Sequence, residues 1–315
     1  MAHSFIQIAQ QGKNEGWRYV VGAVVTLFTF VIPGSLAYIL LVRAYVQVNH
    51  HPDTQLLLPE AFANTALLVE AVGALTLFVC SSLSFLFFWL GIYLTIRFLH
   101  GRSLHSLITP KSRINRWRIA QGFSVFFTLR VIEVAVSYAI APTDFTLNFE
   151  AKTFLLFLGW AILLVPIQTA AEELFCRGYL LQGFGSKLGR WPAIILTALI
   201  FSALHSQNLE VSAQDSLEST LSLMSYYFMI GAFLAWLTLK EQTLELALGV
   251  HAANNMAAFL LITSPDSSIP APAVFSVASV EANVSLLFFN AILLFIFSFI
   301  IFRLLKKPAP TQDSV

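Results

Sequence analysis

Long runs of apolar residues, separated by short polar segments, make up most of this sequence. A helix needs roughly 20 apolar residues to cross the hydrocarbon core of a bilayer. The pattern predicts eight membrane-spanning helices, which are Tyr19–Val42, Ala66–Phe98, Ile119–Ile140, Thr153–Gln182, Trp191–Leu209, Leu221–Leu239, Leu246–Thr263 and Val284–Phe302. The second and fourth runs are longer than one crossing requires, so we expect them to tilt, bend or extend beyond the lipid. We expect Pro166 to bend the fourth.

Composition supports an all-α polytopic membrane protein. Hydrophobic residues make up 57% of the chain and charged residues 11%, whereas a soluble domain carries about 25% charge. So few charges could not cover a surface in water, so we expect membrane lipid as the solvent. The net charge of +1 indicates no polyanion, and we expect no nucleic-acid partner. Cys80 and Cys176 lie far apart in apolar runs, so we interpret both as small buried hydrophobic residues.

Charges between the spans alternate in sign along the chain. One set of loops carries the basic residues Lys13, Arg18, Arg97, Arg102, Lys111, Arg113, Arg116, Arg118, Lys187, Arg190, Lys240, Arg303, Lys306 and Lys307. The other set carries the acidic residues Asp53, Glu60, Asp144, Glu150, Glu210, Asp215, Glu218, Asp266 and Glu281. Because basic loops stay in the cytoplasm, we expect both termini there.

We divide the chain into three parts. Residues 1–150 hold the first three helices and a basic cytoplasmic loop at 97–118, residues 151–262 hold the chemistry, and residues 263–315 hold the last helix and a cytoplasmic tail. We expect the cell membrane of a prokaryote as the location, with the site facing the cytoplasm.

Ionisable residues inside spans are costly and usually mark function or a paired contact. Arg130 and Glu133 are three residues apart, so we interpret them as an ion pair that tunes packing. Glu173 and Arg177, four apart, favour a pair on one helix face. Adjacent helical residues diverge by about 100°, which predicts that Glu172 and Glu173 face different partners. Glu172 would then face a cavity or other helices, where a buried carboxylate suits a proton acceptor.

Two histidines lie in other apolar runs. His205 ends Phe201-Ser202-Ala203-Leu204-His205 in the fifth span, and His251 shares a helix face with Asn255 in the seventh. Counted at about 1.5 Å per residue from the basic end, Glu172 and His205 lie about 18 and 20 Å deep. His251 and Asn255 lie about 9 and 15 Å deep by the same measure. These four polar residues can therefore meet in the inner half of the membrane.

Such a set is sufficient for hydrolysis of an amide bond. A carboxylate and an imidazole can activate a water molecule, directly or through a metal. A second imidazole and an amide can stabilise an oxyanion. Zinc held by Glu172, His205 and His251 is chemically reasonable, although the chain has no His-Glu-x-x-His sequence and no thiolate in the set.

Three short motifs carry a family resemblance. In chain order they are Glu172-Glu173-x-x-x-Arg177, Phe201-x-x-x-His205 and His251-x-x-x-Asn255. They resemble the motifs of the CAAX-protease and bacteriocin-processing (CPBP, or Abi) intramembrane proteases, over about 151–261. The resemblance implies an eight-helix fold with a cavity open to the cytosol.

The resemblance also implies residue roles. Glu172 and His205 would activate the water, and His251 and Asn255 would form the oxyanion site. Glu173, Arg177 and Phe201 would be supporting residues. The family is often labelled metalloprotease, but a metal-independent glutamate mechanism is equally compatible with these residues, so the cofactor stays open.

The leading hypothesis is therefore an intramembrane endopeptidase. Its substrate would be a membrane-associated protein or peptide, with a prenylated CAAX terminus, a peptide precursor or a membrane protein as candidates. An ion- or proton-coupled transporter is an alternative, because membrane carboxylates and histidines also form relays. A non-catalytic membrane partner that retains the fold is another.

Overall fold

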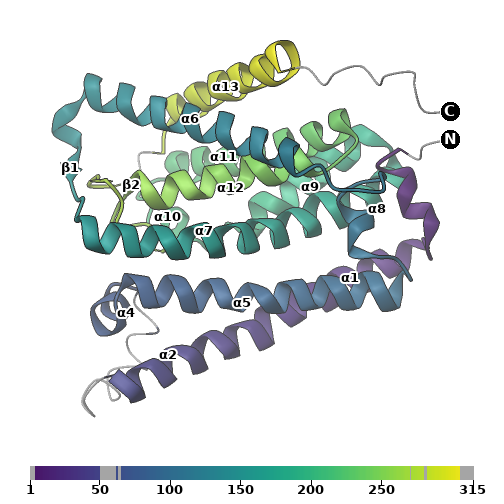
Figure 1. The fold of residues 1–315 in the computed structure, drawn as a ribbon, viewed down its shortest axis with the longest axis horizontal. Helices are drawn as coiled ribbons and strands as arrows, with labels where there is room; N and C mark the ends of the chain where they lie inside the picture. Colours follow the sequence, from purple (N-terminus) through teal and green to yellow (C-terminus); the bar gives the residue numbers. More distant parts are fainter. Residues whose placement is uncertain (1–3, 50–61, 63–64, 270, 280–281, 306–315) are drawn as a thin grey trace.

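The computed structural model describes residues 4–49, 62, 65–269, 271–279 and 282–305. These residues form a bundle of long helices that lie roughly along one axis, with a very small sheet at one end (Figure 1). Five charged loop residues used in the topology argument lie outside the described ranges, namely Asp53, Glu60, Glu281, Lys306 and Lys307. The prediction of an all-α polytopic membrane protein is confirmed.

Among the described residues, six helical segments are long and apolar enough to cross a membrane. They are α1 (Gly16–Thr29) continuing through η2 (Phe30–Gly34) into α2 (Ser35–Asn49); α5 (Ala74–Leu94) with η3 (Thr95–Leu99); α6 (Arg116–Ile140); α7 (Ala151–Glu173) with η6 (Leu174–Leu180) and α8 (Leu181–Leu188); α11 (Leu217–Glu241); and α13 (Val284–Phe299) with η7 (Ile300–Leu304).

Two predicted spans are shorter than expected. Trp191–Leu209 corresponds to the 15-residue helix α9 (Arg190–Leu204), after which the chain turns into the one-turn helix α10 (Leu209–Ser212). Leu246–Thr263 corresponds to the 16-residue helix α12 (Glu245–Leu260). Eleven residues of α12 are buried, so this helix is surrounded by protein and need not match the thickness of the lipid.

The long second and fourth runs each contain a change in helical geometry. The second breaks at Gly73, whose φ of 81° separates α4 (Thr65–Val72) from α5. In the fourth, α7 continues through Pro166, and the regular helix changes to π-helical geometry only at Leu174. Membrane helices tolerate proline because neighbouring groups satisfy the freed backbone. The bend expected at Pro166 stays a prediction, whereas the change of helical geometry lies at Leu174.

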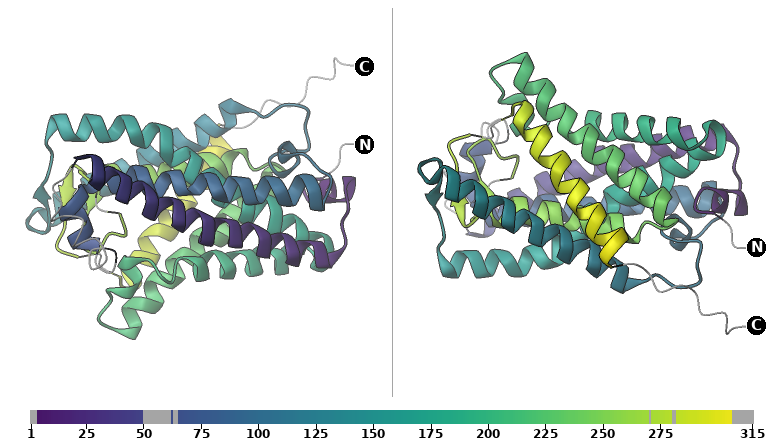
Figure 2. Two further views of the ribbon diagram at one scale, coloured as in Figure 1. Left: turned by 90° about the horizontal axis from the view of Figure 1, so that it is seen from below. Right: turned by 90° about the horizontal axis from the view of Figure 1, so that it is seen from above.

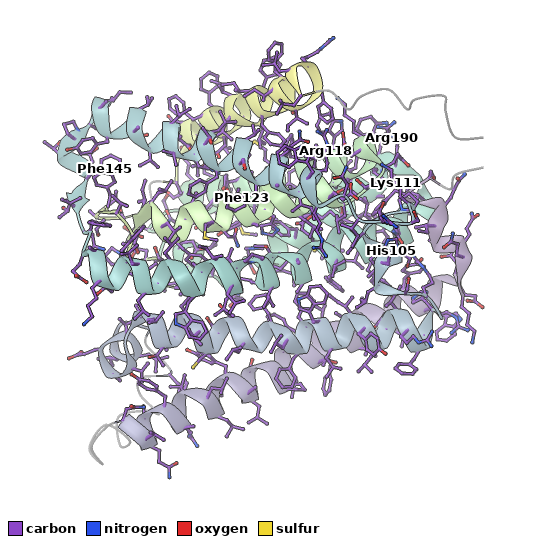
Figure 3. The ribbon with its side chains drawn as sticks, in the orientation of Figure 1. His105, Lys111, Arg118, Phe123, Phe145 and Arg190 are labelled. Carbon is purple, nitrogen blue, oxygen red and sulfur yellow. The ribbon has the colours of Figure 1, made fainter. Side chains whose placement is uncertain are left out.

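The remaining elements close the two ends of the bundle. At one end, β1 (Thr146–Leu147) pairs antiparallel with β3 (Phe275–Ser276), which pairs parallel with β2 (Ile262–Thr263). At the other end lie η1 (Gln7–Gln11) and η4 (Leu104–Leu107), and η5 (Pro142–Asp144) precedes β1. His105, Lys111, Arg118 and Arg190 gather at the end that holds the chain termini, opposite Phe145 (Figure 3).

Helix α12 lies at the centre of the bundle. It contacts α6, α7 and α11, and Figure 1 shows it between α6 and α7. The pair α1 and α2 runs beside α5 on one side, and α13 crosses α6 and α11 on the other (Figure 2). The candidate residues on α7 and α12 therefore lie on neighbouring helices.

Two glycines allow α6 and α12 to approach closely. A Cβ atom added to Gly249 would lie 2.1 Å from the carbonyl oxygen of Ile119, and one added to Gly122 would lie 2.7 Å from that of Leu246. Small residues permit such backbone contact between membrane helices. The position of His251, two residues beyond Gly249, depends on this contact.

We expect Gly249→Ala to destabilise the protein by about 1–3 kcal/mol, because a methyl group would overpack rigid backbone atoms. Gly159→Ala is the matched control, since nothing lies within 4 Å of an added Cβ there and alanine favours a helix interior by about 0.5–1 kcal/mol. Thermal unfolding in detergent, followed by circular dichroism, would measure both. Equal melting temperatures for the two variants would contradict the close-contact argument.

Candidate active site

A fully buried ion pair anchors the site. The Arg177 Nη1 atom donates to Glu173 Oε1 at 2.6 Å, and both side chains have no exposed area. The Arg177 Nη2 atom also donates to the carbonyl oxygen of Gly231 on α11 at 3.3 Å, and its guanidinium lies 4.2 Å from the ring of Phe201 on α9. The predicted pair is present, and it connects three helical segments.

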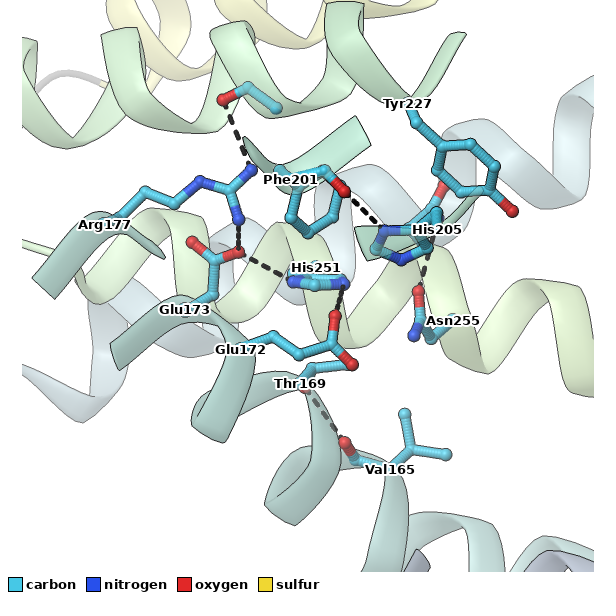
Figure 4. Close-up of polar contacts among 12 residues, drawn as sticks. Val165, Thr169, Glu172, Glu173, Arg177, Phe201, His205, Tyr227, His251 and Asn255 are labelled. Atoms are coloured by element: carbon cyan, nitrogen blue, oxygen red, sulfur yellow. Dashed lines mark hydrogen bonds and ion pairs between the residues drawn. The ribbon is translucent and has the colours of Figure 1, made fainter. Parts of the chain in front are cut away.

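His251 lies between the two adjacent glutamates. Its Nδ1 atom is 2.7 Å from Glu173 Oε1, and its Nε2 atom is 3.6 Å from Glu172 Oε2 (Figure 4). The expectation that Glu172 and Glu173 face different partners is therefore wrong. The two carboxylates do diverge around α7, but an imidazole carries nitrogens on two edges, so one ring from α12 meets both.

These contacts determine where the protons of His251 lie. Glu173, paired with Arg177, is a carboxylate that only accepts hydrogen bonds, so the Nδ1 atom of His251 carries a hydrogen. The Nε2 atom is left facing Glu172. The Glu172 Oε2 atom is buried but accepts no hydrogen bond from the described residues, and the side chain is 14% exposed. Glu172 therefore presents the less constrained carboxylate.

His205 occupies a turn and not the helix interior that the fifth span predicted. It is the first residue after α9, and its Nδ1 atom lies 2.8 Å from the carbonyl oxygen of Phe201. The last carbonyls of a helix have no helical partner, so the imidazole caps one of them. Because a carbonyl only accepts, Nδ1 carries the hydrogen and Nε2 keeps its lone pair.

Asn255 follows His251 by one turn on α12 and is half-buried. Its Oδ1 atom accepts from Asn254 Nδ2 at 3.4 Å. Figure 4 shows Glu172, His251, His205 and Asn255 gathered where α7, α9 and α12 meet. The structure thus brings together the four residues that the sequence singled out as catalytic, and Glu173, Arg177 and Phe201 surround them.

Sequence reasoning missed the residues that surround His205 and hold its neighbours in place. The ring of Tyr227 stacks on His205 with centroids 4.4 Å apart, and its hydroxyl donates to Glu210 Oε1 at 2.6 Å. Glu210 also accepts from Asn208 Nδ2 at 2.9 Å and from the backbone N–H of Ser268 at 3.1 Å. Glu210 was interpreted only as a loop charge. The tyrosine inside an apolar run was the available signal.

The arrangement does not form a ready metal site. In the part of the chain that the structure describes, no three histidine, cysteine, aspartate or glutamate side chains converge closely enough to hold a metal ion. In the set proposed for zinc, the Nδ1 atoms of His205 and His251 bond to Phe201 and Glu173. The Nε2 atoms of both rings remain available, and donation from Nδ1 to a carbonyl or carboxylate is the usual arrangement of a metal-ligating histidine, so these contacts are compatible with zinc as well as with water alone.

The fold and site define an integral membrane protein with a buried glutamate and histidine centre. Residues 152–257 match the family model for type II CAAX prenyl endopeptidase Rce1-like proteins. An uncharacterized protein of Bacillus subtilis (strain 168), YyaK, is 34% identical over 269 residues, which cover 84% of each chain. No solved structure matches significantly. The chain belongs to the CPBP family of intramembrane proteases, through its Rce1-like region.

The two adjacent glutamates should differ in their effect on stability. Glu173→Ala leaves the Arg177 charge buried and unpaired, so we expect a loss of about 3–5 kcal/mol in the free energy of unfolding. Glu172→Ala removes a carboxylate that accepts no hydrogen bond within the described ranges, so we expect less than about 1 kcal/mol of destabilisation. Unfolding by SDS titration would measure both. Similar losses for the two variants would refute the assignment of separate roles.

Proposed function

We propose that the protein is an intramembrane endopeptidase that hydrolyses a peptide bond of a membrane-associated protein or peptide. The observation that carries the proposal is the position of the Glu172 carboxylate, 3.6 Å from His251 and without a hydrogen-bond donor among the described residues. Membership of a protease family supports hydrolysis over transport.

In this proposal Glu172 is the general base. It takes a proton from a water molecule that it holds together with the free Nε2 atom of His205, and the hydroxide attacks the carbonyl carbon of the scissile peptide. The proton then passes from Glu172 to the leaving amine as the C–N bond breaks. The low-polarity surroundings strengthen these interactions because no bulk water competes with them.

The developing oxyanion needs donors on the other side of the carbonyl. His251 and Asn255 are one helical turn apart on α12, so they present a line of two polar groups. An imidazolium at His251 would donate from Nδ1 to Glu173 and from Nε2 to the oxyanion. Asn255 would donate from its Nδ2 atom. Donors held in place before the reaction stabilise charge without reorganisation.

We infer the candidate substrates from the family and the orientation in the membrane from the distribution of charge. Candidate substrates are a prenylated CAAX terminus, a peptide precursor or a membrane protein. The basic residues at one end of the bundle (Figure 3) support a cytoplasmic position for that end. We therefore propose that the site faces the cytoplasm from the cell membrane.

We expect Glu172→Ala to lower the rate of cleavage about a hundredfold or more, the usual loss with a general base. Wild type and the variant would be purified in detergent and assayed on a quenched library of membrane peptides, with and without a chelator. Glu218→Ala, which removes an exposed glutamate on α11, is the matched control and should keep full activity. A reaction by side chains and water alone predicts that the chelator leaves the wild-type rate unchanged.

Equal cleavage by wild type and Glu172→Ala would refute the proposed base. Loss of all activity with the chelator, restored by zinc, would refute the reaction by side chains and water alone. Loss in the Glu218→Ala control would indicate general damage to the protein.

The stacking partner of His205 provides a separate test. We expect Tyr227→Phe to keep most of the activity, because the stacked ring remains. We expect Tyr227→Leu to lose about tenfold, since the imidazole is then held less firmly, and misplacement of a catalytic group by 1 Å can cost about a hundredfold. Initial rates on the cleaved peptide would decide. Equal rates for the two variants would show that stacking does not position His205.

A further inference from the structure

Arg130 on α6 makes three hydrogen bonds, one within its own helix and one to each of two other helices, α11 and α12. Its Nη1 atom donates to Glu133 Oε2 at 2.6 Å, which confirms the predicted ion pair. Its Nη2 atom donates to the Tyr226 hydroxyl on α11 at 2.9 Å and to Asn254 Oδ1 on α12 at 2.8 Å. The Arg130 side chain is 12% exposed. The pair therefore does more than tune packing on one helix.

The guanidinium determines the orientation of the Asn254 amide. A guanidinium has donors and no acceptor, so the atom of Asn254 that faces it must be the oxygen. The Tyr226 hydroxyl donates to the same Oδ1 atom at 3.3 Å. With its oxygen held by two donors, Asn254 directs its Nδ2 atom to Asn255 Oδ1, at 3.4 Å.

The same logic continues to Asn255. Once its oxygen accepts from Asn254, its Nδ2 atom is the group left to face the site. Orientation matters here because the two ends of an amide have nearly the same shape but opposite polarity. A reversed Asn255 would present an oxygen to the developing oxyanion and repel it.

We propose that Arg130, acting through Asn254 and Tyr226, is a positioning residue that fixes the Asn255 amide with its N–H group toward the oxyanion. The inference rests on the proposed function, since it assigns a cause to the orientation that the reaction requires. It also gives a functional reason for the presence of the charged pair Arg130–Glu133 inside a membrane span, where charges are costly. Arg130 itself does not touch the reacting atoms.

Two substitutions at Arg130 separate polarity from packing. Arg130→Lys keeps a group that only donates, whereas Arg130→Gln offers both a donor and an acceptor and no longer imposes a direction. On the peptide that wild type cleaves, we expect Arg130→Gln to lower kcat at least tenfold with KM within twofold, up to the roughly 10²–10³-fold cost of losing an oxyanion donor. We expect Arg130→Lys to recover most of kcat.

Arg118 supplies the matched control on the same helix. It forms a buried ion pair with Glu241 at 2.9 Å, at the basic end of α6. Arg118→Gln should lower the melting temperature but leave kcat of the folded protein within twofold. Combined with Asn255→Ala, Arg130→Gln should cause no further loss of kcat, because the amide that it orients is gone.

Asn254→Asp tests the polarity directly and covers the case in which Arg130→Gln does not fold. The carboxylate keeps the contact with Arg130 but has no N–H, so it presents an oxygen to Asn255 and turns the Asn255 amide around. We expect kcat to fall at least tenfold with the melting temperature unchanged or higher. A phosphonate analogue of the cleaved peptide should bind at least tenfold more weakly, while the parent peptide keeps its KM.

Wild-type kcat in Asn254→Asp, or equal rates in Arg130→Lys and Arg130→Gln, would overturn the inference and leave the proposed function standing. A further loss from Arg130→Gln in the Asn255→Ala background would also overturn it. Wild type that cleaves no peptide of the library would overturn the proposed function, and the inference with it.

Discussion

The buried charge on Arg177 is the constraint on which the rest of the site depends. A charge in a protein interior is tolerated only when it is paired and hydrogen-bonded. Glu173 supplies the opposite charge at 2.6 Å, and the Gly231 carbonyl and the Phe201 ring also contact the guanidinium, whose Nε atom has no hydrogen-bond partner among the described residues. These partners come from α7, α11 and α9, so the contacts of one guanidinium join three helices.

The direction of each hydrogen bond extends this constraint to the candidate catalytic groups. Glu173 only accepts, so it orients His251. The Phe201 carbonyl only accepts, so it orients His205. In both rings the nitrogen on the far edge is left for the site. A small number of groups that can only donate or only accept thus determines which nitrogen of each ring faces the site. Electrostatic stabilisation of a transition state requires donors and acceptors that are oriented in this way before the reaction.

Close packing of helix backbones determines how near the candidate site residues lie to one another. Glycines at 122 and 249 let α6 and α12 approach until their backbones touch. This contact places α12 in the centre of the bundle, where it meets α7 on one face and α11 on another. Helix α12, which contributes His251 and Asn255, need not span the bilayer, because eleven of its sixteen residues are buried among the other helices.

The sequence by itself determined the fold class and the identity of the candidate site. Lipid requires long apolar helices, so the pattern of hydrophobic residues located every major helix, and the i,i+4 spacing predicted the pair Glu173–Arg177 correctly. Polar residues in apolar runs are rare enough to mark the site.

Only the tertiary structure decided how these residues meet. The contact of His251 with both glutamates, the cap formed by His205, and the partners of Arg130 and Tyr227 join residues far apart in the chain. The depth estimate depended on regular helices, but the chain turns at His205 and changes helical geometry at Leu174. Helical periodicity describes one segment at a time, whereas these contacts depend on how several helices pack.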